Sequence, residues 1–234
     1  MGKLSLVATP IGNLEDITIR AIKTLFLADT ILCEDTRRAG QLYHEILARY
    51  GEQFDQNPDS TPTFIPYYDE IEEKQLPHII ELLSSQTNVA LISDAGTPLV
   101  SDPGYRLVRE CHKRNIAVES IPGPSACISA LVSSGLPTHD FRFLGYPHEK
   151  QGKRIALFSA LLKQKENTTY IFYIAPHKLA HTLIDMQSVY TDIEIVIARE
   201  LTKIHEQIWK GTISEALREF SSPRGEFVLL FTLH

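Results

Sequence analysis

Short apolar runs alternate with segments of helical periodicity through the first half of the chain. The run from Leu4 to Thr9 favours a strand and stops at Pro10, where turn residues begin. Asp16 is a suitable N-cap for a first helix that continues to Asp29. Strands are predicted at 4–9, 30–33, 63–66, 89–92 and 118–121. A second helix is predicted after the strand 30–33, running through residues 42 and 46. Further helices are predicted over 71–83, over 105–114 and from an N-cap at 125 to 134. This order predicts a mostly parallel sheet covered by helices on both faces.

The second half of the chain has a different pattern. Strand-like runs lie at 141–144, 170–173, 193–198, 206–209 and 227–232, and helices are predicted at 153–165, 177–186 and 214–220. The strand 206–209 follows its predecessor after a short turn, which predicts a hairpin and a mixed sheet. Pro122 and Pro124 interrupt the chain between the halves. We therefore predict an α/β protein of two domains, residues 1–121 and 122–234.

Composition and charge narrow the class of protein. With 43% hydrophobic and 22% charged residues the chain has material for a real core, which excludes disorder. Its net charge of -6 argues against non-specific nucleic-acid binding but leaves room for a local basic groove. Three widely spaced cysteines form neither a disulfide framework nor a zinc pattern. No run approaches the roughly 20 apolar residues of a membrane helix. We expect a cytoplasmic protein with no membrane segment.

Four loops follow predicted strands, and three of them are rich in glycine, proline and small residues. Ligands of open α/β sheets bind at the carboxyl ends of strands, and glycine allows the backbone to approach a ligand closely. A tight turn would explain any one of these loops, whereas four at one edge predict a binding site. The loops are ATPIGNLEDIT (8–18), CEDTRR (33–38), SDAGTPLVSDPG (93–104) and PGPSA (122–126).

Several familiar kinds of site are excluded by their missing motifs. The chain has no GxGxxG after its first strand, no GxxxxGK[ST] and no GxSxG, so dinucleotide, phosphate-loop and serine-hydrolase chemistry lack their fingerprints. His177 and His181 have the spacing of two metal ligands on one helix face. No carboxylate completes that motif, so we expect a solvent-facing pair and no metal.

Together these motifs resemble the tetrapyrrole methylase family, and within it the methyltransferases that act on small-subunit ribosomal RNA. The resemblance is carried in order by ATPIGNLEDIT, CEDTR, LISDAGTPLVSDPG, IPGPSA, GKR (152–154) and ARELTK (198–203), over nearly the whole chain. It implies two α/β domains, a homodimer, and S-adenosylmethionine bound in the cleft between the domains. It also implies methyl transfer to the ribose 2′-hydroxyl of a cytidine in small-subunit ribosomal RNA.

The resemblance further implies a set of cofactor-binding residues. Asp94 would accept hydrogen bonds from the ammonium or ribose hydroxyls, and the backbone amides of the helix that Ser125 begins suit the methionine carboxylate. Ile11, Ile174 and Leu201 would form apolar walls for adenine. The full set is Pro10, Ile11, Ser93, Asp94, Thr97, Ser125, Ala126, Ile174 and Leu201.

Charged residues near these loops are the candidates for catalysis and RNA binding. Methyl transfer to a hydroxyl needs an aligned nucleophile and a group that accepts its proton. Glu34 or Asp35 is the predicted base, and Lys203 is a further catalytic candidate. A salt-bridged cleft wall explains such charges equally well. The residues predicted to meet RNA phosphates are Arg37, Lys153 and Arg154.

Two features depart from the pattern of this group. Ile174 stands where the group carries glutamate, and the acidic run YYDEIEE (67–73) would repel RNA if it lined the groove. Two other functions therefore stay open. The acceptor is a small molecule of the corrinoid or precorrin kind in the first, since the same fold serves such enzymes. The second is a non-catalytic module that binds the cofactor and transfers nothing.

Overall fold

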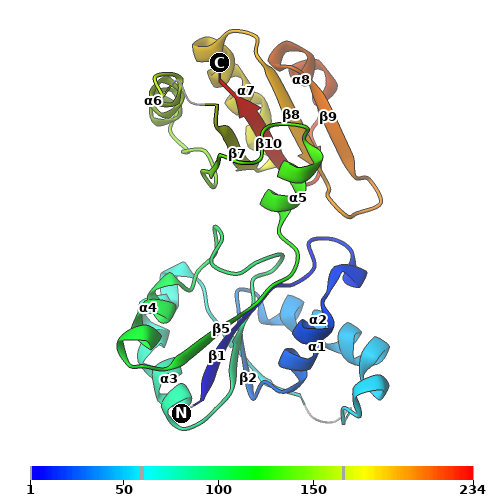
Figure 1. Cartoon of the computed structure of the whole chain (residues 1–234), viewed down its shortest axis with the longest axis vertical. Coiled ribbons are helices and arrows are strands. Elements are labelled where there is room, and N and C mark those ends of the chain that lie inside the picture. The colour runs from blue at the N-terminus through cyan, green and yellow to red at the C-terminus, as the bar shows by residue number, and fades with distance from the viewer. Residues whose placement is uncertain (1, 58–60, 165–166, 234) are drawn as a thin grey trace. The chain divides into compact units, whose positions relative to one another are not determined.

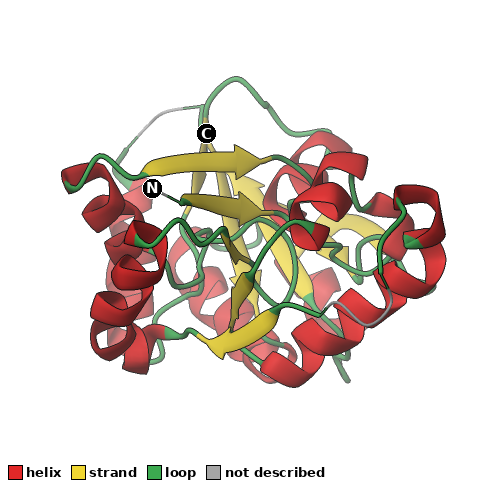
Figure 2. Ribbon diagram, turned by 90° about the horizontal axis from the view of Figure 1, so that it is seen from below, coloured by secondary structure: helices red, strands yellow, loops and turns green. Residues whose placement is uncertain are grey.

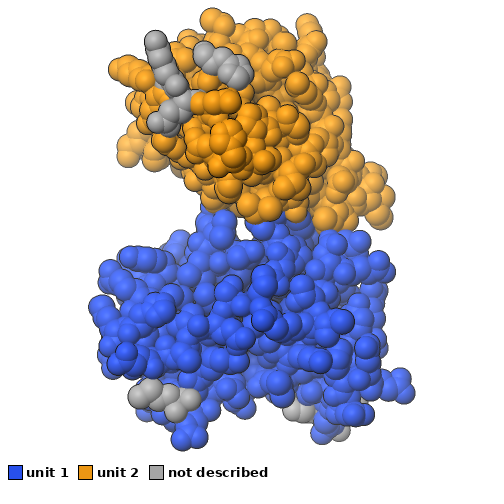
Figure 3. Space-filling view, viewed as in Figure 1, with its two compact units in different colours: residues 1–125 blue, residues 126–234 orange. Residues whose placement is uncertain are grey.

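The chain divides into two compact units, residues 1–125 (unit 1) and 126–234 (unit 2), coloured separately in Figure 3. The computed structural model describes residues 2–57, 61–164 and 167–233. The boundary expected from the sequence, 121/122, falls at the end of the last strand of unit 1.

Unit 1 is built on a five-stranded parallel sheet. Its strand order is β3-β2-β4-β1-β5, and every neighbouring pair is parallel. All five carboxyl ends therefore lie at one edge, which brings the loops singled out in the sequence to the same side. The strands are β1 (Lys3–Val7), β2 (Thr30–Cys33), β3 (Thr63–Pro66), β4 (Val89–Leu91) and β5 (Ala117–Ile121).

Helices cover both faces of this sheet, as Figures 1 and 2 show. The helices α1 (Ile19–Phe26) and α2 (Thr36–Tyr50) share a core with Ile31 and Cys33 of β2. The helices α3 (Asp69–Ser84) and α4 (Tyr105–Lys113) pack with Leu32, whose side chain points to the other face. The chain leaves β1 toward one face and the adjacent β4 toward the other. The helices that follow β1 and β4 therefore lie on opposite faces, so the carboxyl ends of these two strands form a topological switch point, where such sheets bind ligands.

The first helix begins later than the sequence indicated. Asp16 ends a short 3-10 turn, Leu14–Asp16 (η1), and does not cap α1. The cap is Thr18, whose hydroxyl accepts a hydrogen bond from the Ala21 amide at 3.1 Å. Both residue types are good N-caps, so local preference alone could not separate them.

Unit 2 has a mixed five-stranded sheet of order β6-β7-β10-β8-β9. The pair β6–β7 is parallel and the other pairs are antiparallel. The predicted hairpin is present as β8 and β9, and the fold class predicted from the sequence is confirmed. The strands are β6 (Phe141–Phe143), β7 (Thr169–Ile174), β8 (Glu194–Arg199), β9 (Gln207–Thr212) and β10 (Phe227–Thr232).

The helices of unit 2 follow the sequence prediction with shifted ends. The helix expected over 153–165 spans 151–162, and residue 165 lies outside the described residues. The helix expected from 177 starts with a 3-10 turn, Pro176–Lys178 (η3). A capping box of Thr212 and Glu215 starts the last helix. The helices are α5 (Ala126–Ser133), α6 (Gln151–Leu162), α7 (Leu179–Tyr190) and α8 (Ile213–Glu219).

The cysteines are all free thiols in the core. Cys33, Cys111 and Cys127 are buried, and burial raises the pKa of the Cys33 thiol to about 12. Within residues 2–57, 61–164 and 167–233, no helix combines the length and the apolar character needed to cross a bilayer. The same residues contain no cluster of three or more His, Cys, Asp or Glu arranged to hold a metal ion.

Candidate functional site

Three loops are tied together at the carboxyl edge of the unit 1 sheet. Thr9 and Gly96 exchange backbone hydrogen bonds of 2.9 and 3.1 Å, which join the loop after β1 to the loop after β4. The Thr97 hydroxyl donates to the Pro124 carbonyl at 3.0 Å and adds the loop after β5. Gly96 has a φ of +86°, and a Cβ there would lie 3.2 Å from the Ile11 side chain. The glycine thus permits the approach that gathers these predicted cofactor residues.

The predicted residues of these loops have different surroundings. Ile11 and Ser93 are buried, whereas the Asp94 side chain is 31% exposed. The Ser93 hydroxyl donates to the carbonyls of Ala95 and Gly96 at 3.3 and 3.4 Å, so it shapes the loop from within. The Asp94 carboxylate therefore stays accessible, whereas the Ser93 hydroxyl is used within the loop.

Four carboxylates from three segments of the chain cluster beside these loops. Glu34 follows β2, Asp94 follows β4, Asp102 lies in the same loop as Asp94, and Asp69 begins α3. Burial, then the Asp94 charge, raises the pKa of Glu34, although a backbone hydrogen bond from Asp94 opposes this. Burial, then the Glu34 charge, raises the pKa of Asp102 to about 7. Arg38 pairs with Asp94 at 2.8 Å. The cluster is still rich in negative charge and suits a cationic ligand.

Asp102, Asp69 and Arg38 were not among the predicted cofactor-binding or catalytic residues, although Asp69 lies in the acidic run 67–73. Asp102 stands within the quoted motif SDAGTPLVSDPG, so the motif itself was its signal. Arg38 lies in CEDTRR, but its partner Asp94 is 56 positions away, and only the parallel pairing of β2 with β4 brings them together.

The acidic run 67–73 is partly neutralised by contacts within unit 1. The Tyr67 hydroxyl donates to Glu72 at 3.1 Å, and both residues are buried. Arg106 pairs with Glu72 at 3.7 Å and also with Glu73. Of the four carboxylates in this run, Glu72 is therefore withdrawn from the surface, whereas Asp69, Glu70 and Glu73 stay exposed, Glu73 beside Arg106.

Asp35 serves as the cap of α2. Its Oδ1 accepts from the amides of Arg37 and Arg38 at 2.8 and 3.4 Å, and its Oδ2 pairs with the Arg37 guanidinium at 3.2 Å. These bonds from Arg37 lower the pKa of Asp35, which makes it a weak base. Of the two predicted bases, Glu34 has the better proton affinity. The Arg37 side chain is 88% exposed.

In unit 2, two predicted cofactor residues lie at the same edge of the mixed sheet. Ile174 ends β7 and Arg199 ends β8, and both pair with Phe227 at the start of β10. Leu201 follows two positions after Arg199. Ile174 and Leu201 are 2% and 8% exposed, so both side chains are packed within the protein at this edge.

Lys203 is held in a turn by two carboxylates. Its Nζ lies 3.0 Å from Glu200 and 3.0 Å from Glu226. Burial lowers the pKa of Lys203, but the bonds to Glu200 and Glu226 outweigh this effect and leave the pKa raised. Lys203 therefore stays a cation at neutral pH, which fits a positioning or electrostatic task and excludes proton acceptance.

The neighbouring residues Lys153 and Arg154 have opposite environments. Lys153 is exposed, whereas the Arg154 side chain is only 11% exposed and pairs with Asp185 at 2.6 Å. Arg154 Nη1 also donates to the His148 and Glu149 carbonyls at 2.9 and 2.6 Å. Its donors are thus directed at the protein and not at an RNA phosphate.

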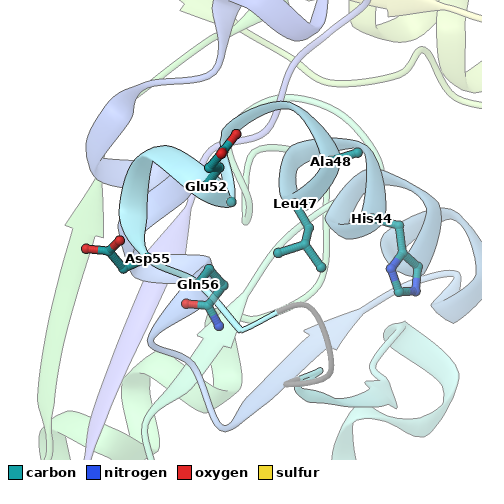
Figure 4. Close-up of a pocket in the computed structure, with 7 residues that line it drawn as sticks. His44, Leu47, Ala48, Glu52, Asp55 and Gln56 are labelled. Atoms are coloured by element: carbon teal, nitrogen blue, oxygen red, sulfur yellow. The ribbon is translucent and has the colours of Figure 1, made fainter.

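A pocket of about 580 Å³ lies elsewhere on unit 1 (Figure 4). It is formed by His44 and Leu47 near the end of α2 and by Glu52, Asp55 and Gln56 after it. The helix α2 begins at the carboxyl edge and runs about 22 Å before it ends. This pocket is therefore separate from the carboxylate cluster, and it contains none of the predicted site residues.

The raised pKa of Asp102 predicts a pH dependence of stability. The folded protein binds a proton more tightly than the unfolded chain, so Asp102 reduces stability as pH rises from about 4 to about 7. We expect Asp102→Asn to unfold at higher urea concentration than the wild type at pH 8, with the gap closing toward pH 4. Urea titrations at several pH values measure this. A gap independent of pH would contradict the assignment.

Unit 1 has a parallel sheet whose carboxyl edge carries loops and carboxylates, and unit 2 has a mixed sheet. These features are typical of an α/β ligand-binding protein of two units. The model of the Tetrapyrrole (Corrin/Porphyrin) Methylases family matches residues 3–217, and the chain belongs to this family.

The similarity to these relatives covers nearly the whole of this chain. The chain is 40% identical over 234 residues to the "Ribosomal RNA small subunit methyltransferase I" of Thermotoga maritima, covering 99% of each chain. It is 43% identical to the protein of the same name from Synechocystis, covering 98% of this chain and 78% of the relative. Among solved structures, Thermus thermophilus uroporphyrin-III C-methyltransferase complexed with S-adenyl homocysteine has a TM-score of 0.62. Its identity is 17%, with 98% and 97% of the chains covered.

Proposed function

We propose that this protein transfers a methyl group from S-adenosylmethionine to the ribose 2′-hydroxyl of a cytidine in small-subunit ribosomal RNA. The similarity to two enzymes named for small-subunit ribosomal RNA, over nearly the full chain, carries the substrate assignment. The assignment of the ribose 2′-hydroxyl and of cytidine as the acceptor rests on the sequence motifs and the resemblance that they carry. We further propose that the protein acts as a homodimer in the cytoplasm.

The residues of unit 1 fit this cofactor by charge. The carboxylate cluster complements the cationic sulfonium and ammonium groups, with Asp94 as the acceptor. Pro10, Ile11, Thr97 and Ser125 stand on the tied loops, and the buried Ser93 holds one loop in shape. Ala126 begins α5, and Ile174 and Leu201 supply apolar walls. When bound, S-adenosylmethionine supplies an electrophilic methyl group.

The other predicted residues divide into three tasks. Glu34 accepts the proton of the attacking hydroxyl, because its raised pKa lies closer to neutral pH than the pKa of an ordinary carboxyl group. Lys203 holds the turn that carries Leu201. Arg37 and Lys153 are exposed cations available to RNA phosphates. Arg37 has to give up its ion pair with Asp35 to bind a phosphate.

The test of this function is a titration calorimetry measurement with S-adenosylmethionine followed by tritiated-methyl transfer to small ribosomal subunits that lack ribose methylation. Binding with label in the RNA, mapped to a ribose, is the expected result. Binding without transfer would favour a small-molecule acceptor or a non-catalytic module. Absence of binding would overturn the cofactor assignment.

Asp94 is the residue whose loss should weaken cofactor binding most directly. We expect Asp94→Ala to raise the Kd for S-adenosylmethionine by about tenfold or more, as loss of a charged hydrogen bond does. Arg38→Ala is the matched control, because it removes the Arg38–Asp94 pair and keeps the carboxylate. Calorimetry on both variants decides the question. Equal weakening in both would show that the ion pair, and not Asp94 itself, matters.

A further inference from the structure

Unit 2 contains a pocket of about 340 Å³ at the carboxyl ends of β6 and β7. These strands are parallel, so the segments that follow them meet at one edge. Ile174 and Thr182 are buried at its base, and the Tyr146 side chain stands 60% exposed among its lining residues. The volume is at the lower end of the range of about 300–1,000 Å³ for small-ligand pockets. It suits one ligand of nucleotide size.

The segment 146–149, which follows β6 and lines this pocket, is held in place by Arg154. Arg154 donates to the carbonyls of His148 and Glu149 while its guanidinium pairs with Asp185, which is itself buried. One buried cation therefore ties the segment after β6 to the helices α6 and α7. The pocket is preformed, which lowers the entropic cost of binding.

The side chains at the pocket combine an aromatic surface with a cation. Tyr146 packs edge-on against Tyr173 at 5.8 Å, and the Tyr173 hydroxyl accepts from the Cys127 amide at 3.1 Å. Lys178 lines the same pocket and pairs with Glu149, whose side chain is 81% exposed. An exposed carboxylate is readily exchanged for a stronger anion such as phosphate. Aromatic stacking beside a phosphate-binding cation is how proteins recognise single-stranded RNA.

We propose that this pocket holds one nucleotide of the RNA substrate, with the nucleobase against Tyr146 and the phosphate on Lys178. The inference rests on the proposed function and deepens it, because it assigns nucleotide recognition to residues of unit 2. His148, which also lines the pocket, adds a second donor for the same phosphate.

Charge separates this occupant from the cofactor. Ile174 lines the pocket and is also a proposed wall for adenine. The cofactor is cationic and matches the carboxylate cluster of unit 1, whereas Lys178 and His148 match an anion. Arg154 is neutralised by Asp185 and does not alter this balance.

The experiment compares Tyr146→Ala, Tyr146→Phe and Lys178→Gln in the full chain. Small ribosomal subunits lacking ribose methylation are the probe, with tritiated S-adenosylmethionine as donor. We expect Tyr146→Ala to raise the KM for subunits about tenfold or more, and Tyr146→Phe to stay near wild type. Lys178→Gln should raise KM and flatten its salt dependence. The Kd for S-adenosylmethionine should be unchanged in all three.

Matched controls come from α4, on the opposite unit. Tyr105 is an exposed tyrosine, 66% exposed, and Lys113 is an exposed lysine paired with Glu110, so Tyr105→Ala and Lys113→Gln should behave as wild type. An unchanged KM in Tyr146→Ala, with an active wild type, would overturn this inference alone. A weakened cofactor Kd in that variant would assign the pocket to the cofactor instead. A wild type that binds the cofactor but methylates no subunits would overturn the proposed function and this inference with it.

Discussion

Glu34→Gln is expected to lower kcat for RNA methylation by about 10²-fold or more, with little change in the Kd for S-adenosylmethionine. A positioned general base typically contributes about 10²- to 10⁴-fold, and glutamine keeps the shape of glutamate without its proton affinity. Burial and the Asp94 charge raise the pKa of Glu34, so the wild-type rate should fall on the acidic side as this carboxylate becomes protonated. Single-turnover methyl transfer, measured from below the ordinary carboxyl pKa to above neutral pH, measures both effects.

The neighbouring carboxylate is the control for this prediction. Asp35→Asn keeps an oxygen that can accept the amides of Arg37 and Arg38, so α2 should remain capped and activity nearly normal. The acidic limb of the pH profile should disappear in Glu34→Gln and persist in Asp35→Asn. The reverse pattern would make Asp35 the base despite its lowered pKa, and full activity in both variants would remove proton acceptance from this edge.

The order of elements was accessible to sequence reasoning because buried parallel strands appear as short apolar runs. β2, for example, is buried at every position, and β4 likewise. The parallel arrangement then places every loop after a strand at one edge, so the location of the site followed from topology. The start of α1 did not, because Asp16 and Thr18 are both capable caps and only the η1 turn decides between them.

The charged residues of the site were harder to assign. The residue types of Arg38, Asp94 and Asp102 do not reveal which charges become neighbours, since this depends on how strands from distant segments pair. The burial of Arg154 had a local signal, because it precedes the buried Phe158 by four positions and Leu161 by seven. Those spacings define one helix face, on which Arg154 lies and Lys153 does not.

Arg154→Met is expected to destabilise unit 2 by about 3–5 kcal/mol. The substitution leaves Asp185 as a buried carboxylate whose charged partner is gone, and such uncompensated charges carry costs of this size. Gln151 still donates to Asp185 at 2.8 Å, but a neutral amide replaces only part of a guanidinium. Urea unfolding followed by the fluorescence of Trp209, the single tryptophan of the chain, reports on unit 2 directly.

The double variant Arg154→Met with Asp185→Leu separates an internal ion pair from a phosphate contact. Replacing both charges by apolar groups removes the uncompensated carboxylate, so much of the lost stability should return. If Arg154 instead served RNA phosphates, as the sequence alone predicted, Arg154→Met would leave unfolding unchanged and weaken RNA binding with a reduced salt dependence. The segment after β6 provides a second criterion. Its carbonyls lose their Arg154 donor in either variant, so the pocket at Tyr146 should loosen even where stability is restored, and the KM for subunits should remain raised.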